Sequence, residues 1–192
     1  MDAPSVVAAA DRLLERARGW HVRTDCEPVQ LEGSRRCLVQ RVAVEGADAP
    51  PTVIVKAHGE SFETFINEAA AAEFLSSSRD LAGFGPHLSA VDSDVPLVVL
   101  EDMGAHPSVA DALLGSDPDQ AAAFLVQWAG TLGQLHSATL GAREAFDARR
   151  QRLAGEREVA FGDEEPAAEL ARGVKAICDL GVERPPGLES GR

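Results

Sequence analysis

The chain has 192 residues, of which 45% are hydrophobic, enough for one ordinary globular domain. Its formal net charge of -13 argues against nucleic acid or an anionic membrane surface as a partner, because no basic stripe offsets the acidity. No apolar run is long enough to cross a bilayer, no secretory signal is seen, and the three cysteines share no metal or disulfide spacing, so we expect a cytoplasmic protein.

The first half of the chain predicts one helix followed by strands. Residues 5–18 carry apolar side chains at spacings of three and four and end at Gly19, which is typical of an amphipathic helix. Residues 21–31, 37–44 and 51–58 are rich in valine and leucine and are predicted to be strands. Because short turns join these strands, an antiparallel meander is the simplest arrangement.

The strand at 51–58 contains Lys56, one of only two lysines in the chain. In a strand, Val53 and Val55 would point to one face, while Ile54 and Lys56 would share the other. A lysine there either extends its ammonium to water or has an anionic partner. We expect Glu68 to be that partner, since it lies on a helix predicted over residues 61–76.

The segments at 87–91 and 97–100 are two further predicted strands, separated by a turn at residues 92–94. With the strands before them they make a five-stranded antiparallel sheet with one main helix, a small α+β lobe. After residues 101–104 the sequence becomes helical. Ser108 begins a capping box for a short helix that Gly115 closes.

A longer helix is predicted over residues 118–140, and another over residues 166–180. We divide the chain into an N-terminal helix (1–19), a sheet-containing lobe (20–103), a helical part (104–182) and a disordered tail (183–192). The side chains that the longer helix is predicted to bury are Phe124, Leu125, Trp128, Leu132, Leu135 and His136.

Five short motifs occur in order between residues 20 and 140. They are Val53-Ile54-Val55-Lys56, Phe65-Ile66-Asn67-Glu68-Ala69-Ala70, Phe84-Gly85-Pro86, Leu97-Val98-Val99-Leu100-Glu101-Asp102-Met103-Gly104 and Gly133-Gln134-Leu135-His136. In this order they resemble the kinase-like phosphotransferases, specifically the aminoglycoside and choline phosphotransferase branch. The resemblance implies a kinase-like nucleotide-binding lobe at residues 20–103, followed by the first helices of a truncated second lobe.

The resemblance also implies a role for each site residue. Lys56 would hold the α- and β-phosphates of ATP, and Glu68 would orient it through an ion pair. Backbone groups near Glu101 and Met103 would meet the edge of the adenine. Gly33 and Ser34 would lie over the phosphates, in a loop with one glycine where protein kinases have three.

One departure from the family pattern concerns catalysis. Transfer in this family needs an aspartate, an asparagine five residues later and a further metal-binding aspartate, all in the helical lobe. The only asparagine in the chain is Asn67, which precedes that lobe. We therefore expect no catalytic residue in this chain, and we expect the ligands of the Mg²⁺ that accompanies ATP to lie outside it.

Three functions remain open from the sequence. The first is the nucleotide-binding part of an ATP-dependent small-molecule phosphotransferase. The second is a non-catalytic, pseudokinase-like module that depends on a partner, with a homodimer or a companion chain covering the apolar face of the long helix. The third is an unrelated α+β domain without a ligand, in which Lys56 only extends to solvent and Gly33 only forms a turn.

Overall fold

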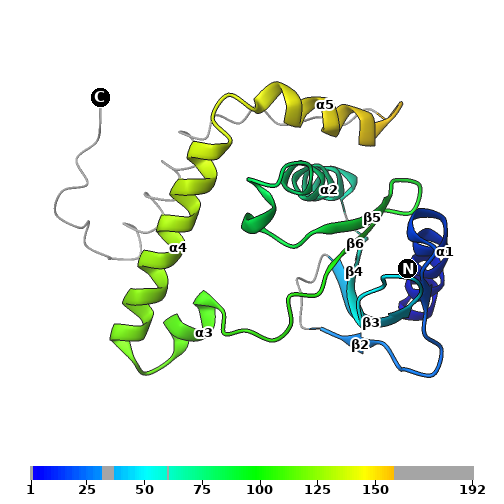
Figure 1. Cartoon of the computed structure of the whole chain (residues 1–192), viewed down its shortest axis with the longest axis horizontal. Helices are drawn as coiled ribbons and strands as arrows, with labels where there is room; N and C mark the ends of the chain where they lie inside the picture. Colours follow the sequence, from blue (N-terminus) through cyan, green and yellow to red (C-terminus); the bar gives the residue numbers. More distant parts are fainter. Residues whose placement is uncertain (1, 32–36, 60, 158–192) are drawn as a thin grey trace. The chain divides into compact units, whose positions relative to one another are not determined.

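The computed structural model describes residues 2–31, 37–59 and 61–157 (Figure 1). All of these residues belong to one compact unit. Within these ranges the protein is α+β, with an antiparallel sheet and helices. None of the helices found there combines the length and the apolar character needed to cross a membrane.

Helix α1 (Ala3–Arg18) confirms the helix predicted at residues 5–18 and extends it by one half-turn. The Asp2 side chain caps its first turn by accepting from the Ser5 N–H, and Gly19 ends it in the left-handed conformation. Val6, Ala10 and Leu14 are completely buried and belong to the main core. The segment predicted as a separate N-terminal helix at 1–19 is therefore part of the core of the lobe that follows it.

The sheet has six strands among the described residues rather than the predicted five. The segment predicted as one strand at 21–31 forms two short strands, both of which pair with β3. The residues between these two strands do not pair with β3. Pro28, which has no N–H to donate, and the turn at Thr24 and Asp25 explain the interruption. The strands are β1 (His21–Val22), β2 (Val29–Gln30), β3 (Cys37–Glu45), β4 (Thr52–His58), β5 (Leu88–Asp92) and β6 (Leu97–Glu101).

All strand pairs are antiparallel, in the order β1-β3-β4-β6-β5 with β2 beside β3. The predicted meander of the early strands is confirmed, because β3 pairs with β1 and β2 on one side and β4 on the other. Strand β4 alternates as predicted: Val53 and Val55 are buried in the core with α1, and Lys56 lies on the opposite face. The sheet thus has an α1 face and a second face that contains Lys56.

Helix α2 (Phe62–Ser76) packs against this second face. Its predicted N-cap is confirmed, because the Ser61 hydroxyl accepts from the Thr64 N–H. Phe65, Ile66 and Ala69 are fully buried along one side of the helix. A short 3-10 turn, η1 (Ala82–Phe84), leads from α2 toward β5. The helix is therefore held firmly enough to fix the position of any side chain it directs at β4.

Within the described ranges, three helices follow β6, namely α3 (Val109–Leu114), α4 (Pro118–Ala138) and α5 (Arg143–Ala154). The capping box at Ser108 is confirmed, since its hydroxyl accepts from the Asp111 N–H and the Asp111 carboxylate accepts from the Ser108 N–H. Helix α5 packs against α2, with Phe146 edge-on to Phe74 and Arg152 paired with Glu73. Helices α3, α4 and α5 thus belong to the same compact unit as the sheet-containing lobe.

The predicted burial along α4 is wrong. No residue of α4 is buried, and Trp128 and Val126 are 54% and 74% exposed. The apolar spacing that predicts a buried stripe is present, but α3 is the main partner of α4 among the described elements. The helix predicted at 166–180 and the tail at 183–192 lie outside the described residues.

Candidate functional site

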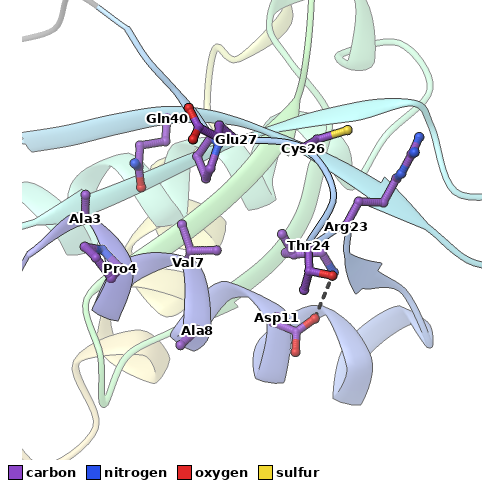
Figure 2. Close-up of a pocket in the computed structure, with 12 residues that line it drawn as sticks. Ala3, Pro4, Val7, Ala8, Asp11, Arg23, Thr24, Cys26, Glu27 and Gln40 are labelled. Carbon is purple, nitrogen blue, oxygen red and sulfur yellow. Dashed lines mark hydrogen bonds between the residues drawn. The ribbon is translucent and has the colours of Figure 1, made fainter.

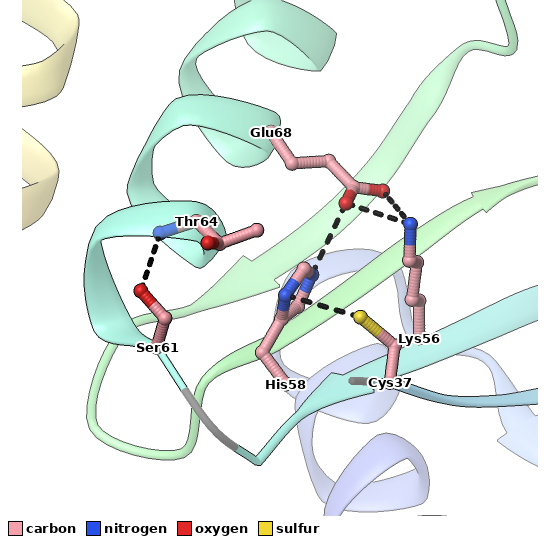
Figure 3. A network of polar contacts seen from close by, with 6 residues as sticks. All are labelled: Cys37, Lys56, His58, Ser61, Thr64 and Glu68. Atoms are coloured by element: carbon pink, nitrogen blue, oxygen red, sulfur yellow. Dashed lines mark hydrogen bonds and ion pairs between the residues drawn. The ribbon is translucent and has the colours of Figure 1, made fainter. Parts of the chain in front are cut away.

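The ion pair predicted between Lys56 and Glu68 is present in the structure (Figure 3). The Lys56 Nζ lies 2.7 Å from each oxygen of the Glu68 carboxylate. The two side chains are 25% and 27% exposed, so the pair is open to solvent on one side. A lysine ammonium has three N–H donors, and a contact with one carboxylate leaves donor capacity for a second anion.

Local structure explains why the pair forms. Lys56 sits on a central strand, directly opposite Val39 on β3 and Val98 on β6. Its aliphatic stem therefore lies over an apolar part of the sheet, and the ammonium extends toward α2. Glu68 lies on the side of α2 between the buried Ile66 and Ala69, which directs its carboxylate down to the sheet.

Two further residues join this pair. His58 lies two residues after Lys56 on the same face of β4, and Cys37 is its partner across the strand pair. The His58 Nε2 lies 3.3 Å from a Glu68 oxygen, and the Cys37 Sγ lies 3.5 Å from the His58 Nδ1. The His58 side chain is almost completely buried, with the Phe65 ring edge-on to it at 5.7 Å.

The electrostatics of Glu68 reflect these neighbours. Burial raises the pKa of the Glu68 carboxyl, but the contacts from His58 and Lys56 outweigh burial and hold the pKa below its usual value. Glu68 is therefore ionised at neutral pH. Its negative charge faces both the Lys56 ammonium and the His58 ring.

A second polar cluster joins three strands where β6 ends. Asp102 accepts two hydrogen bonds from the Arg41 guanidinium, of 2.5 and 2.9 Å, and one of 2.6 Å from the Thr52 hydroxyl. The same carboxylate accepts from the N–H of Gly104, which has a φ of 79°. The bonds from Arg41, followed by those from Thr52 and Gly104, lower the pKa of Asp102 to about 2 despite its burial.

In the segment predicted to contact adenine, only part of the backbone has hydrogen-bonding groups available for a ligand. The N–H of Glu101 donates to the His87 carbonyl, and the Glu101 carboxylate accepts from the His87 N–H. Met103 is exposed, and its backbone makes no hydrogen bond to another described residue. The backbone of Met103 is thus the better candidate of the two for a ligand contact. Gly33 and Ser34, predicted to cover the phosphates, lie outside the described residues.

Two cavities formed by described residues lie away from Lys56. The larger, about 640 Å³, lies between α1 and the segment joining β1 and β2 (Figure 2). Gln40 extends from β3 into it, toward Ala3 and Val7, and its buried Oε1 has no hydrogen-bond partner. The other, about 550 Å³, lies between α2 and the turn joining α4 and α5 and includes His136. Neither is lined by Lys56, Glu68 or Met103.

No group of three or more histidine, cysteine, aspartate or glutamate side chains within the described ranges is placed to hold a metal ion. A comparison with protein-family models finds no match, and neither does a comparison with curated protein sequences.

The polar residues that the sequence analysis missed all lie close to predicted ones. His58 belongs to no motif of the sequence, yet strand alternation places it on the same face as Lys56. The contact of Cys37 with His58 follows from the register of the β3–β4 pair, which the sequence leaves undefined because residues 46–51 allow several turn lengths. Asp102 belongs to the predicted motif at 97–104, but no role follows for it from that motif. Its bonds to Arg41 depend on the position of β3 relative to β6.

Proposed function

We propose that this chain is the nucleotide-binding part of an ATP-dependent small-molecule phosphotransferase, similar to the aminoglycoside and choline phosphotransferase branch of the kinase-like proteins. The proposal combines the ordered motifs of the sequence with the antiparallel sheet and with helix α2, which packs against the face that contains Lys56. The catalytic aspartate loop is absent from the chain, so transfer itself would need residues supplied from elsewhere.

The observation that carries the proposal is the two-oxygen contact between Glu68 and the half-buried Lys56. A fully exposed lysine needs no carboxylate partner, because water solvates its ammonium. A fully buried lysine could not be reached by a ligand. An intermediate position, with the ammonium fixed by one acid and still reached by solvent, suits the binding of phosphate oxygens.

Each residue would have a defined task toward Mg-ATP, which supplies the phosphoryl group when bound. Lys56 would donate to phosphate oxygens and neutralise part of their charge. Glu68 would hold the ammonium in place, which lowers the conformational entropy lost on binding. The backbone N–H and C=O of Met103 would face the base edge, because the end of β6 leaves them without partners among the described residues. The described residues offer no ligand set for Mg²⁺.

Isothermal titration of Mg-ATP into the wild type and Lys56→Ala tests the proposal. We expect measurable binding by the wild type and a loss of at least about tenfold in affinity for the variant, since a charge-assisted contact to phosphate contributes about 1.5–3 kcal/mol. Glu68→Gln should weaken binding by less, because the lysine remains.

Matched controls separate a local effect from a change in total charge. Arg12→Ala removes an exposed cation from α1, on the other face of the sheet, and Glu63→Gln neutralises another acid of α2. Both should bind Mg-ATP as the wild type does. Absence of binding by the folded wild type would leave an α+β domain with no nucleotide function.

A second candidate is a binding module that works with a partner chain. It is favoured by the exposed apolar side chains of α3 and α4, which include Leu114 and Val126 as well as Trp128. Sedimentation velocity across a concentration series distinguishes the two candidates. Reversible association that Trp128→Ser abolishes, without any nucleotide binding, would favour the module, whereas a monomer at all concentrations would count against it.

A further inference from the structure

We propose that Cys37, His58 and Glu68 form an activated-thiol site, at which small oxidants of the peroxide class modify Cys37. The three side chains come from β3, β4 and α2, and they contact one another in that order (Figure 3). A nucleophile, a base and an orienting carboxylate in sequence are the arrangement that activates a thiol for attack. This inference does not depend on nucleotide binding.

The geometry assigns a separate task to each ring nitrogen of His58. Nδ1 faces the Cys37 sulfur at 3.5 Å, and Nε2 faces the Glu68 carboxylate at 3.3 Å. The His58 Nε2 makes no regular hydrogen bond to a described residue, so its contact with the Glu68 carboxylate is mainly electrostatic. In the neutral ring with its proton on Nε2, Nδ1 is the acceptor for the thiol proton.

Proton transfer from the thiol to Nδ1 gives a thiolate and an imidazolium. The charged groups then alternate in sign along the chain of contacts: thiolate, imidazolium, carboxylate and the ammonium of Lys56. The imidazolium and the carboxylate then each lie between two opposite charges, which favours the ionised state in a partly buried site. Among the described residues, the groups in contact with the His58 ring are Cys37 from β3 and Glu68 and the Phe65 edge from α2, and the Lys56 ammonium lies on the far side of the Glu68 carboxylate.

The reaction with hydrogen peroxide follows from this state. The thiolate attacks one peroxide oxygen, an S–O bond forms and the O–O bond breaks. The leaving hydroxide takes the proton from the imidazolium and departs as water, so the products are a cysteine sulfenic acid, water and neutral His58. The sulfur is oxidised and the peroxide is reduced, and no other reactant is needed. Cys37 is half-buried, which admits a molecule as small as a peroxide.

The first experiment measures thiolate formation in the whole protein. Iodoacetamide alkylation is followed peptide by peptide by mass spectrometry from about pH 5.5 to 9, with N-acetylcysteine amide as the reference thiol. Between about pH 8.5 and 6 an ordinary thiol loses about 150-fold in rate. We expect Cys37 to lose less than about tenfold over the same range. A Cys37 profile parallel to the reference overturns the proposal.

Two variants test the assigned roles. His58→Asn should return the Cys37 profile to that of the reference thiol, and Glu68→Gln should move it part of the way, because the imidazolium loses its carboxylate. If circular dichroism shows that His58→Asn is unfolded, the Glu68→Gln profile decides alone. A wild-type profile in the variant that folds overturns the proposal.

The second experiment measures oxidation. Protein treated with hydrogen peroxide in the presence of dimedone should carry the sulfenic acid adduct on Cys37 at least about tenfold above Cys26, which lines the cavity on the α1 face. Equal labelling of the two cysteines, or preferential labelling of Cys26, overturns the proposal. Cys37→Ser should abolish the adduct at position 37 and leave Cys26 unchanged.

Discussion

The two faces of the sheet differ sharply in chemistry although they belong to the same strands. The α1 face is filled by aliphatic side chains, among them Leu14, Val53 and Val55, all fully buried. The α2 face carries an acid, a lysine, a histidine and a cysteine in mutual contact. Apolar burial supplies most of the folding free energy, and it occurs on both faces, since Phe65 and Ile66 are also fully buried against the α2 face. Only the α2 face adds charged groups that solvent still reaches.

The largest expected loss of stability comes from a substitution in the core on the α1 face. Leu14→Ala should destabilise the protein by about 2–5 kcal/mol, because it removes a completely buried side chain and leaves a cavity. Urea unfolding followed by circular dichroism measures the change. The matched control is Leu114→Ala, whose side chain is 88% exposed and whose loss should change stability by less than about 0.5 kcal/mol. Similar effects for the two variants would contradict the assignment of the core.

An intermediate effect is expected for the polar cluster at the end of β6. Asp102→Asn should cost roughly 2 kcal/mol at neutral pH, because it removes the charge from a buried carboxylate that accepts four hydrogen bonds. The exposed Asp94 provides the control, Asp94→Asn, which should be near neutral.

The effect at Asp102 should also depend on pH. The pKa of Asp102 is lowered to about 2 in the folded state, below its value of about 3.9 in an unfolded chain. The carboxylate therefore stabilises the fold above about pH 4, and this contribution is lost as the pH falls toward 2. The stability difference between wild type and Asp102→Asn should shrink over that range. A difference that is constant with pH would show that the charge is not the cause.

The smallest effect on stability is expected for Lys56 on the α2 face, which tests the difference between the two faces directly. Lys56→Met should change the free energy of unfolding by less than about 1 kcal/mol, because the ion pair with Glu68 is partly exposed and screened by solvent. The same substitution should remove Mg-ATP binding under the proposed function. Thermal unfolding and titration calorimetry of one preparation measure both quantities. A large loss of stability would instead assign the pair to the core.

The sequence predicts those parts of the fold that depend on local patterns. Alternation of side chains in 51–58 places Lys56 on the other face of the strand from the buried valines. The caps at Ser61 and Ser108 define where two helices begin. These features follow from backbone periodicity and from side chains that satisfy neighbouring N–H groups. They need no knowledge of distant contacts.

Features that depend on contacts between elements distant in the sequence are predicted poorly from the sequence. The stripe containing Leu125 and Trp128 indicates an apolar surface but not whether another element covers it. The contact between Cys37 and His58 requires the register of β3 against β4, and the bonds from Arg41 to Asp102 require the order β3-β4-β6. The Lys56–Glu68 pair could be predicted because a lysine on an apolar strand needs an anionic partner and the next helix supplies Glu68, and the resemblance to known phosphotransferases implies the same pair.

The position of α1 limits how the protein can be shortened or fused. Val6, Ala10 and Leu14 close one side of the sheet, and Arg18 donates to the carbonyl of Ser89 on β5. A version beginning at the first strand would expose a row of valines and is expected to aggregate. An affinity tag is best attached through a flexible spacer ahead of Asp2, so that the first turn keeps its cap.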